Sequence, residues 1–271
     1  MMRQGSCADR WCCVDTLLRM KNAFYLELAR KVRRAFRTPL SDSRAYQVLF
    51  RGKDGLEIGG PTELFRRVLP VYEVARSVDG VNFSSSTVWE GELTEGRTYR
   101  YATHCVGWQS ISEATDLSRI PAEGYDFVLS SNSLEHIANP LKAVNEWLRV
   151  LRPGGHLLLV LPRKESNFDH RRDLTKFDHL VDDFERDTSE HDLTHLEEIL
   201  DRHDYAMDPP AVDRETMKRR SLANFENRCL HHHVFDPALV EAVFRHFGLQ
   251  PLLQTATATD YIAVARKAAR Q

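Results

Sequence analysis

The sequence predicts an α/β fold in which a mostly parallel sheet is covered by helices on both faces. Two segments about seventy residues apart, 55–61 and 125–136, each consist of a short apolar run that breaks off into glycine or small polar residues. A third segment, 157–161, contains only leucine and valine, as expected for a strand that is buried on both faces. Open sheets of this class hold ligands at the carboxyl ends of their strands, so we expect the functional groups where these runs end.

The N-terminal part of the chain predicts helices. Residues 1–40 are interpreted as a leader followed by an amphipathic helix over 14–36, because apolar residues recur there at three- and four-residue steps between Arg and Lys. The basic face of that helix could contact an anionic membrane or simply be solvated. A main domain is expected over 41–271, beginning with a short helix at 41–50.

The first half of this domain predicts one strand–turn–helix unit and a second strand. Residues 55–58 form the expected first strand, and the Gly59-Gly60-Pro61 turn leads into a helix over 62–68. Residues 71–75 are expected to form the second strand. The stretch 80–107 has no clear periodicity and is expected to be a long loop.

In the second half of the domain, capping residues mark where the predicted helices begin and end. A strand is expected over 125–130, and Asn139-Pro140 begins a helix that Pro153-Gly154-Gly155 ends before a central strand at 156–161. Residues 163–233 are charged, rich in His and Asp and partly helical, and are interpreted as an inserted cap. Asp236-Pro237 then begins another helix, after which two last strands are expected at 251–257 and 260–265.

The composition excludes several classes of protein. Of the 271 residues, 42% are hydrophobic and 28% charged, which is typical of a soluble globular protein. The net charge of −2 gives no basic field for nucleic acid, and the absence of a long apolar run argues against stable membrane insertion. Five cysteines without framework or zinc spacing (Cys7, Cys12 and Cys13 among them) favour reduced thiols and a cytoplasmic location. The oligomeric state stays open.

Together, Glu57-x-Gly59, Leu134-Glu135-His136 and Leu151-Arg152-Pro153-Gly154-Gly155 resemble the class I S-adenosylmethionine-dependent methyltransferases, over roughly residues 50–165. The resemblance implies a Rossmann-like, doubly wound sheet of seven strands ending in an antiparallel hairpin. It also implies S-adenosylmethionine as the cofactor.

The resemblance assigns cofactor-binding positions to each part of S-adenosylmethionine. The methionine end would lie against Gly59 and Gly60, with the Glu57 carboxylate near the amino group and Ser131 in the floor of the site. The ribose would be bound by a carboxylate at the end of the second strand, which Asp79 or, failing that, Glu73 would supply. The adenine would lie against Glu113 and Ala114.

Methyl transfer to a hydroxyl requires a base, and histidine is suited to that role near neutral pH. We expect His136, the Asp169-His170 pair and the run His231–His233 to converge above the methyl group. The candidate catalytic residues are therefore His136, His170, His232 and His233.

The leading hypothesis is O-methylation of a small polar molecule or a glycan, because the cap is polar. One alternative is a non-catalytic binding protein, since Pro61 and Glu63 replace two glycines of the family's cofactor loop. Another is a metal-dependent enzyme that uses the histidine-rich cap, where His191, Asp192, His195 and Glu198 have helix-face spacing and could be joined by His231–His233. No His-Glu-x-x-His signature is present, so the leading hypothesis includes no metal.

Overall fold

The structure is a computed structural model that describes residues 39–208 and 213–270. The predicted helix over 14–36 and the cysteines Cys7, Cys12 and Cys13 lie outside the described residues. Residues 40–271 form one compact unit.

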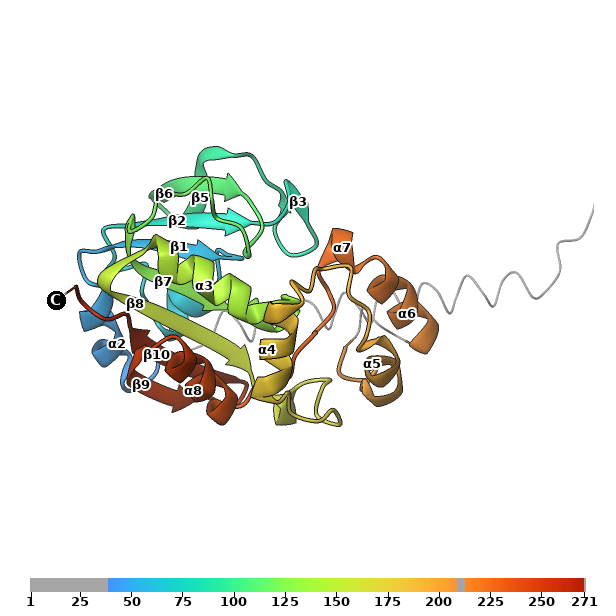
Figure 1. The fold of residues 1–271 in the computed structure, drawn as a ribbon. Helices are drawn as coiled ribbons and strands as arrows, with labels where there is room; N and C mark the ends of the chain where they lie inside the picture. The colour runs from blue at the N-terminus through green and yellow to red at the C-terminus, as the bar shows by residue number, and fades with distance from the viewer. Residues whose placement is uncertain (1–38, 209–212, 271) are drawn as a thin grey trace, which may run out of the picture. The chain divides into compact units, whose positions relative to one another are not determined.

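The unit is built on an eight-stranded sheet with the strand order β5-β6-β2-β1-β7-β8-β10-β9 (Figure 1). The strands are β1 (Asp54–Ile58), β2 (Ser77–Asn82), β5 (Gly96–Ala102), β6 (Cys105–Ile111), β7 (Tyr125–Ser131), β8 (Leu151–Pro162), β9 (Gln250–Ala256) and β10 (Asp260–Arg266). The five strands from β6 to β8 are parallel, while β10 pairs antiparallel with both β8 and β9. The mostly parallel sheet and its C-terminal hairpin are therefore confirmed. The sheet has eight strands rather than seven because β5 adds an antiparallel edge to β6.

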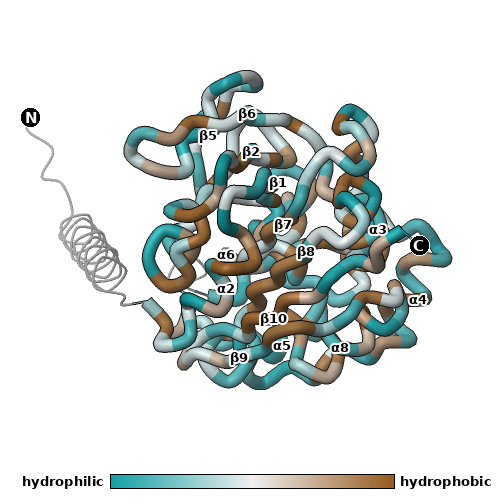
Figure 2. The backbone as a smooth tube through the Cα atoms, turned by 90° about the vertical axis from the view of Figure 1, so that its left-hand side faces the viewer, coloured by the Kyte–Doolittle hydropathy of each residue, from teal (hydrophilic) through white to brown (hydrophobic). Residues whose placement is uncertain are grey.

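Helices cover both faces of the sheet. Successive strand residues point to opposite sides, and in β8 the side chains on both sides are apolar and packed against helices. On β8, Leu157 and Leu159 join the apolar cluster formed with α3 (Pro140–Val150), α4 (Phe177–Glu185) and α8 (Pro237–His246). Leu158 and Val160 join the second cluster with α2 (Ser43–Phe50) and η1 (Leu64–Val68). Figure 2 shows the hydrophobic stretches of β7, β8 and β10 at the centre of the unit.

The predicted capping residues are confirmed for α3 and α8, the two longest helices among the described residues. The Asn139 side chain accepts a hydrogen bond from Lys142 N at the start of α3, at 3.0 Å. The Asp236 side chain accepts one from Leu239 N at the start of α8, at 2.8 Å. Each cap satisfies an amide that has no partner inside its own helix, which explains why these boundaries could be predicted.

The prediction of the second strand is wrong. Residues 71–74 form turns, and the strand β2 lies further along the chain. The expected loop over 80–107 also contains β5 and most of β6. Its glycines mark close packing inside the sheet: a Cβ on Gly80 would lie 2.1 Å from the Tyr99 ring, and one on Gly107 would lie 1.9 Å from Val78 O.

Residues 163–233 carry η3 (Lys164–Ser166) and the helices α4, α5 (Leu196–Arg202), α6 (Arg214–Leu222) and α7 (Asn224–Asn227). The segment lies against the loop and the short helix η2 (Leu134–His136) that follow β7. Glu190 Oε1 accepts a hydrogen bond from Ala138 N at 3.1 Å, and His232 N donates one to Glu135 O at 2.8 Å. These contacts place the segment beside the carboxyl end of β7. The division into a domain and an inserted cap stays a prediction.

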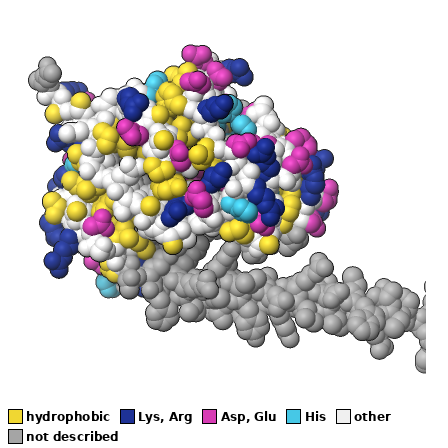
Figure 3. Space-filling model, turned by 90° about the horizontal axis from the view of Figure 1, so that it is seen from below, with side chains coloured by type: hydrophobic (Ala, Val, Ile, Leu, Met, Phe, Trp, Pro, Cys, Tyr) yellow, Lys and Arg dark blue, Asp and Glu magenta, His cyan; other side chains and the backbone are white. Residues whose placement is uncertain are grey.

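Within the described residues, no helix combines the length and the apolar character needed to cross a bilayer. On the face that Figure 3 shows, Lys and Arg side chains are mixed with Asp and Glu side chains. The two-stranded ribbon of β3 (Ser86–Thr87) and β4 (Gly91–Glu92) completes the fold and lies near the carboxyl end of β2.

Candidate active site

Hydrogen bonds join the carboxyl ends of β1, β2 and β7 into one surface. Gly59 N donates to Val81 O at 2.8 Å, and the Asn82 side chain donates to Gly60 O at 3.1 Å. From the other side, Ser133 Oγ donates to Ile58 O at 3.2 Å. Since parallel neighbours end at the same edge of a sheet, the predicted positions Glu57, Gly59, Gly60 and Ser131 do come together here.

Only glycine fits at the turn after β1. Gly59 has φ +76°, a left-handed conformation that other residues adopt at a cost, and a Cβ there would lie 2.6 Å from Ser133 Oγ. A Cβ on Gly60 would lie 2.2 Å from Glu57 Oε1. Gly60 is buried against Glu57, whereas Gly59 is exposed, so a ligand could approach the main chain of the turn at Gly59.

Glu57 is a buried carboxyl group held by uncharged donors. Tyr72 and Tyr99 both donate their hydroxyls to Oε2, Tyr99 at 2.7 Å, and Thr62 N donates to Oε1 at 3.2 Å. Burial disfavours the charged form and raises the pKa of Glu57 to about 7, although these hydrogen bonds oppose the shift. A carboxylate has roughly four acceptor positions, so Glu57 keeps one for a further donor.

Two polar atoms close to the end of β7 are buried and have no hydrogen-bond partner among the described residues. They are Ser131 Oγ and Glu135 Oε2. Burial also raises the pKa of Glu135 to about 7. Buried polar groups are nearly always satisfied, so unsatisfied atoms at strand ends are candidates for ligand contacts.

The predicted position of Asp79 at the end of the second strand is wrong. Asp79 lies in the middle of β2, opposite Leu56, and its carboxylate accepts hydrogen bonds from Trp108 N at 2.7 Å and Tyr125 OH at 2.8 Å. The fallback residue Glu73 is exposed in the turn before β2. The residue that ends β2 is Asn82, which a correct strand boundary would have identified.

The adenine candidates Glu113 and Ala114 follow β6. Glu113 Oε1 accepts a hydrogen bond from Arg228 Nη2 at 2.6 Å, and Ala114 O accepts one from the Trp147 indole at 3.0 Å. Burial raises the pKa of Glu113, while the charge of Arg228 acts in the opposite direction. Arg228 also lies 3.1 Å from Glu190, so this corner of the site is tied to segment 163–233.

His136 is the predicted catalytic residue nearest to the end of β7. Its Nδ1 lies 3.2 Å from Leu230 O, a contact that requires the hydrogen on Nδ1 and leaves the lone pair on Nε2. Burial lowers the pKa of His136 well below its usual range, and the charge of His231 lowers it further. The ring packs against Trp89 and His231, with centroid distances of 5.4 and 4.4 Å. His136 is therefore neutral near pH 7.

Behind His136 lies an ionic group formed by Asp169, Arg172 and His231. Asp169 Oδ2 is 2.5 Å from His231 Nδ1, and Asp169 Oδ1 is 3.1 Å from Arg172 Nη1. Burial alone would raise the pKa of Asp169, but its two cationic partners lower it to about 2. Burial would likewise lower the pKa of His231, and the charge of Asp169 raises it instead.

The other predicted histidines do not converge on this point. His170 pairs with Asp204 at 2.9 Å. His232 Nε2 accepts a hydrogen bond from Asn224 at 3.2 Å, and His233 Nε2 donates to Ala138 O at 3.3 Å. Each of the three elements that were expected to meet contributes one residue to this point, namely His136, Asp169 and His231.

The predicted helix-face set in the cap is also not assembled. Helix α5 begins at Leu196, and the His191 ring stacks on Phe225 while the Asp192 carboxylate accepts from Thr194. Sequence reasoning further missed Tyr72 and Tyr99, because a tyrosine that binds a carboxyl group from another strand leaves no local pattern.

Residues 25–254 match the model of a family described as Methyltransferase domain. Solved structures with some similarity include a SAM-dependent methyltransferase from Aquifex aeolicus, with 13% identity, coverage of 84% of this chain and 89% of that one, and a TM-score of 0.47. They also include a possible histamine N-methyltransferase from Thermotoga maritima, with 15% identity, coverage of 90% and 97%, and a TM-score of 0.46.

No curated protein sequence matches this chain. The family match extends over more than half of the chain. The chain therefore belongs to the methyltransferase-domain family and is an S-adenosylmethionine-dependent methyltransferase.

Proposed function

We propose that the protein methylates an oxygen atom of a small polar molecule or a glycan, with His136 as the base that accepts the hydroxyl proton. When bound, S-adenosylmethionine supplies a methyl group on a positively charged sulfur. The protein then has to align the acceptor with that methyl group and remove its proton.

The residues at the strand ends fit such a cofactor. Gly59 is exposed at the turn after β1, so its main chain is accessible to a ligand. Glu57 keeps an acceptor position for an ammonium group, and Ser131 Oγ is buried without a partner among the described residues. These observations support binding of the methionine end across the turn after β1.

For the ribose we propose Asn82 in place of Asp79, because Asn82 ends β2 and an amide can exchange hydrogen bonds with hydroxyls. Glu113 and Ala114 remain the proposed adenine contacts. Their position after β6, the next parallel strand beyond β2, supports this order along the sheet edge.

A single observation carries the assignment of His136 as the base. The bond of Nδ1 to Leu230 O fixes the tautomer, so Nε2 of a neutral ring is available as an acceptor. The buried Asp169, Arg172 and His231 behind the ring hold it in place. The polar and cationic side chains of segment 163–233 favour a polar acceptor over an apolar one.

The non-catalytic alternative depends on the unusual residues of the cofactor loop. The carboxylate of Glu63 pairs with Arg66 and Arg67 of the following helix η1, so it is held by its own helix. Pro61 follows directly on Gly60, so the turn keeps its glycines at the two positions where a Cβ would clash. A non-catalytic protein would bind S-adenosylmethionine without transferring its methyl group to any acceptor.

The test is turnover of His136→Gln with methyl-labelled S-adenosylmethionine and an acceptor found by screening glycans and hydroxylated small molecules. We expect turnover to fall about 100-fold with cofactor affinity within about two-fold of the wild type, because a lost base slows proton removal without altering cofactor contacts. His246→Gln, on the exposed face of α8, is the control and should retain full turnover. Full turnover in His136→Gln would exclude this residue as the base.

A further inference from the structure

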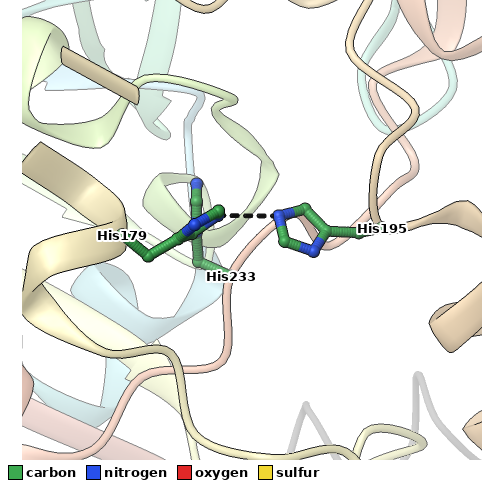
Figure 4. A group of neighbouring side chains, drawn as sticks. All are labelled: His179, His195 and His233. Carbon is green, nitrogen blue, oxygen red and sulfur yellow. Dashed lines mark hydrogen bonds between the residues drawn. The ribbon is translucent and has the colours of Figure 1, made fainter. Parts of the chain in front are cut away.

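A second cluster of histidines lies within segment 163–233, away from His136. His179 comes from α4, His195 immediately precedes α5, and His233 lies in the connection between α7 and α8. One ring nitrogen from each lies within 4.8 Å of the other two. Figure 4 shows the hydrogen bond that joins the His179 and His195 rings beside His233. Nothing in methyl transfer at the strand ends requires this arrangement.

The distances suit a metal ion with nitrogen ligands. His179 Nε2 and His195 Nε2 are 2.9 Å apart, and Asp183 Oδ2 lies 3.3 Å from His179 Nε2. In a tetrahedral zinc site with bonds of about 2.0–2.1 Å, ligand atoms lie about 3.3 Å apart. The cluster is thus close to the size that such an ion requires.

Two buried atoms, one in the cluster and one beside it, have no hydrogen-bond partner among the described residues, which a simple hydrogen-bonded group does not explain. His233 donates from Nε2 to Ala138 O, so its Nδ1 carries a lone pair, and Nδ1 has no hydrogen-bond partner among the described residues. Asp183 Oδ2 likewise has none in the described part of the chain. The His233 ring is 1% exposed. Metal-binding histidines commonly donate their second nitrogen to a main-chain carbonyl, as His233 does to Ala138.

An ion could also reach this place from solvent. A cleft of about 240 Å³ is lined by His179 and His195 together with Arg172, Lys176 and Glu198. Glu198 Oε2 lies 3.9 Å from His195 Nδ1 and brings a negative charge to this side of the cluster. Asp183, on the same helix as His179, supplies negative charge beside the cluster.

We propose that His179, His195 and His233 bind one divalent transition-metal ion of the zinc class, with Asp183 compensating its charge. The ion joins α4, the start of α5 and the segment before α8. Because these three pieces come from separate parts of the sequence, binding should stabilise the packing of segment 163–233.

The test uses the full chain after treatment with a chelator, with Zn²⁺ and Co²⁺ as probes. We expect one Zn²⁺ per chain, a higher melting temperature with Zn²⁺, and the intense visible absorption of four-coordinate Co²⁺. His179→Gln and His195→Gln, both partly exposed positions that should fold, should each weaken Zn²⁺ binding by about 100-fold or more and remove the gain in melting temperature.

His191→Gln is the matched control. It lies four residues before His195 but stacks on Phe225 outside the cluster, so Zn²⁺ affinity should be unchanged. If His179→Gln and His195→Gln bind Zn²⁺ as tightly as the wild type and His191→Gln, the pair is an ordinary histidine hydrogen bond and the proposal fails. Failure of this test would leave the assignment of His136 untouched, because that assignment is measured by methyl transfer.

Discussion

Glu57 at the end of β1 and Asp169 after β8 are both almost completely buried, with exposed fractions of 1% and 2%. Their pKa values nevertheless shift in opposite directions. Glu57 is surrounded by tyrosine hydroxyls and an amide, and its pKa rises to about 7. Asp169 lies between His231 and Arg172, and its pKa falls to about 2. Burial alone therefore does not determine the charge of a carboxyl group, because the charge of its partners does.

The difference suits the two regions to different tasks. The strand-end region holds a carboxyl group that gains from a positively charged ligand, as the ammonium group of the cofactor would be. The ionic group of Asp169, Arg172 and His231 lies within segment 163–233 and fixes the position of the His231 ring behind His136.

The largest effect should come from breaking the ionic group. Asp169→Asn leaves Arg172 buried at 2% exposure, with Glu198 at 3.6 Å as its nearest other anion. A buried charge that has lost its closest anionic partner should reduce the free energy of unfolding by about 3–5 kcal/mol, measured by urea denaturation at pH 7. Asp204→Asn, which loses only the outer pairs with His170 and Arg171, should cost far less. Equal losses in both variants would contradict the ionic account.

Replacing Glu57 should change the pH dependence of stability. The folded protein keeps the Glu57 proton up to about pH 7, whereas the unfolded chain loses it near pH 4.5, so stability should fall as pH rises through this window. The fall amounts to roughly 3 kcal/mol for Glu57, and Glu135, with a pKa of about 7, adds a similar fall. The free energy of unfolding of Glu57→Gln, taken relative to the wild type at each pH, should therefore rise by roughly 3 kcal/mol between pH 4.5 and 7.5 in denaturation measurements. A difference that does not change with pH would mean that Glu57 is ionised throughout.

A smaller effect is expected from removing one of the tyrosine hydroxyls that donate to Glu57. Tyr99→Phe removes one donor to Glu57 Oε2 but keeps the ring that packs on Gly80. We expect a loss of about 1 kcal/mol at pH 7 and a further rise in the pKa of Glu57, because the charged form loses a hydrogen bond. Tyr261→Phe, whose hydroxyl meets exposed Glu165, should change neither quantity. A pKa that falls in Tyr99→Phe would contradict this interpretation.

The parts of the fold that could be predicted from the sequence have local causes. The boundaries of α3 and α8 follow from Asn139 and Asp236, whose side chains bind amides three residues later. The central strand β8 is marked by its continuous apolar run. By contrast, the position of β2 could not be predicted, because the dipeptide Asp79-Gly80 is typical of a turn. In the structure Gly80 lies inside β2, where the absence of a side chain leaves space for the Tyr99 ring of another strand.

The same reason limits the prediction of the site. The placement of Gly59, Gly60 and Ser131 could be predicted because each lies at or just after the end of a strand, while their contact with a cofactor stays a prediction. The separation of His231, His232 and His233 could not, because their partners Asp169, Asn224 and Ala138 are brought in by the packing of segment 163–233. Adjacent histidines in an extended segment thus belong to different clusters.

The most direct test of the cofactor site is calorimetry of S-adenosylmethionine binding to the wild type and Ser131→Ala, with the melting temperature of each ligand-free protein. Ser131 Oγ is buried and unsatisfied within the described residues, so its removal should leave the ligand-free protein equally or more stable. Loss of one hydrogen bond to the bound cofactor should weaken binding about five- to ten-fold. Unchanged affinity in Ser131→Ala, or no binding to the wild type at saturating cofactor, would contradict a cofactor site at these strand ends.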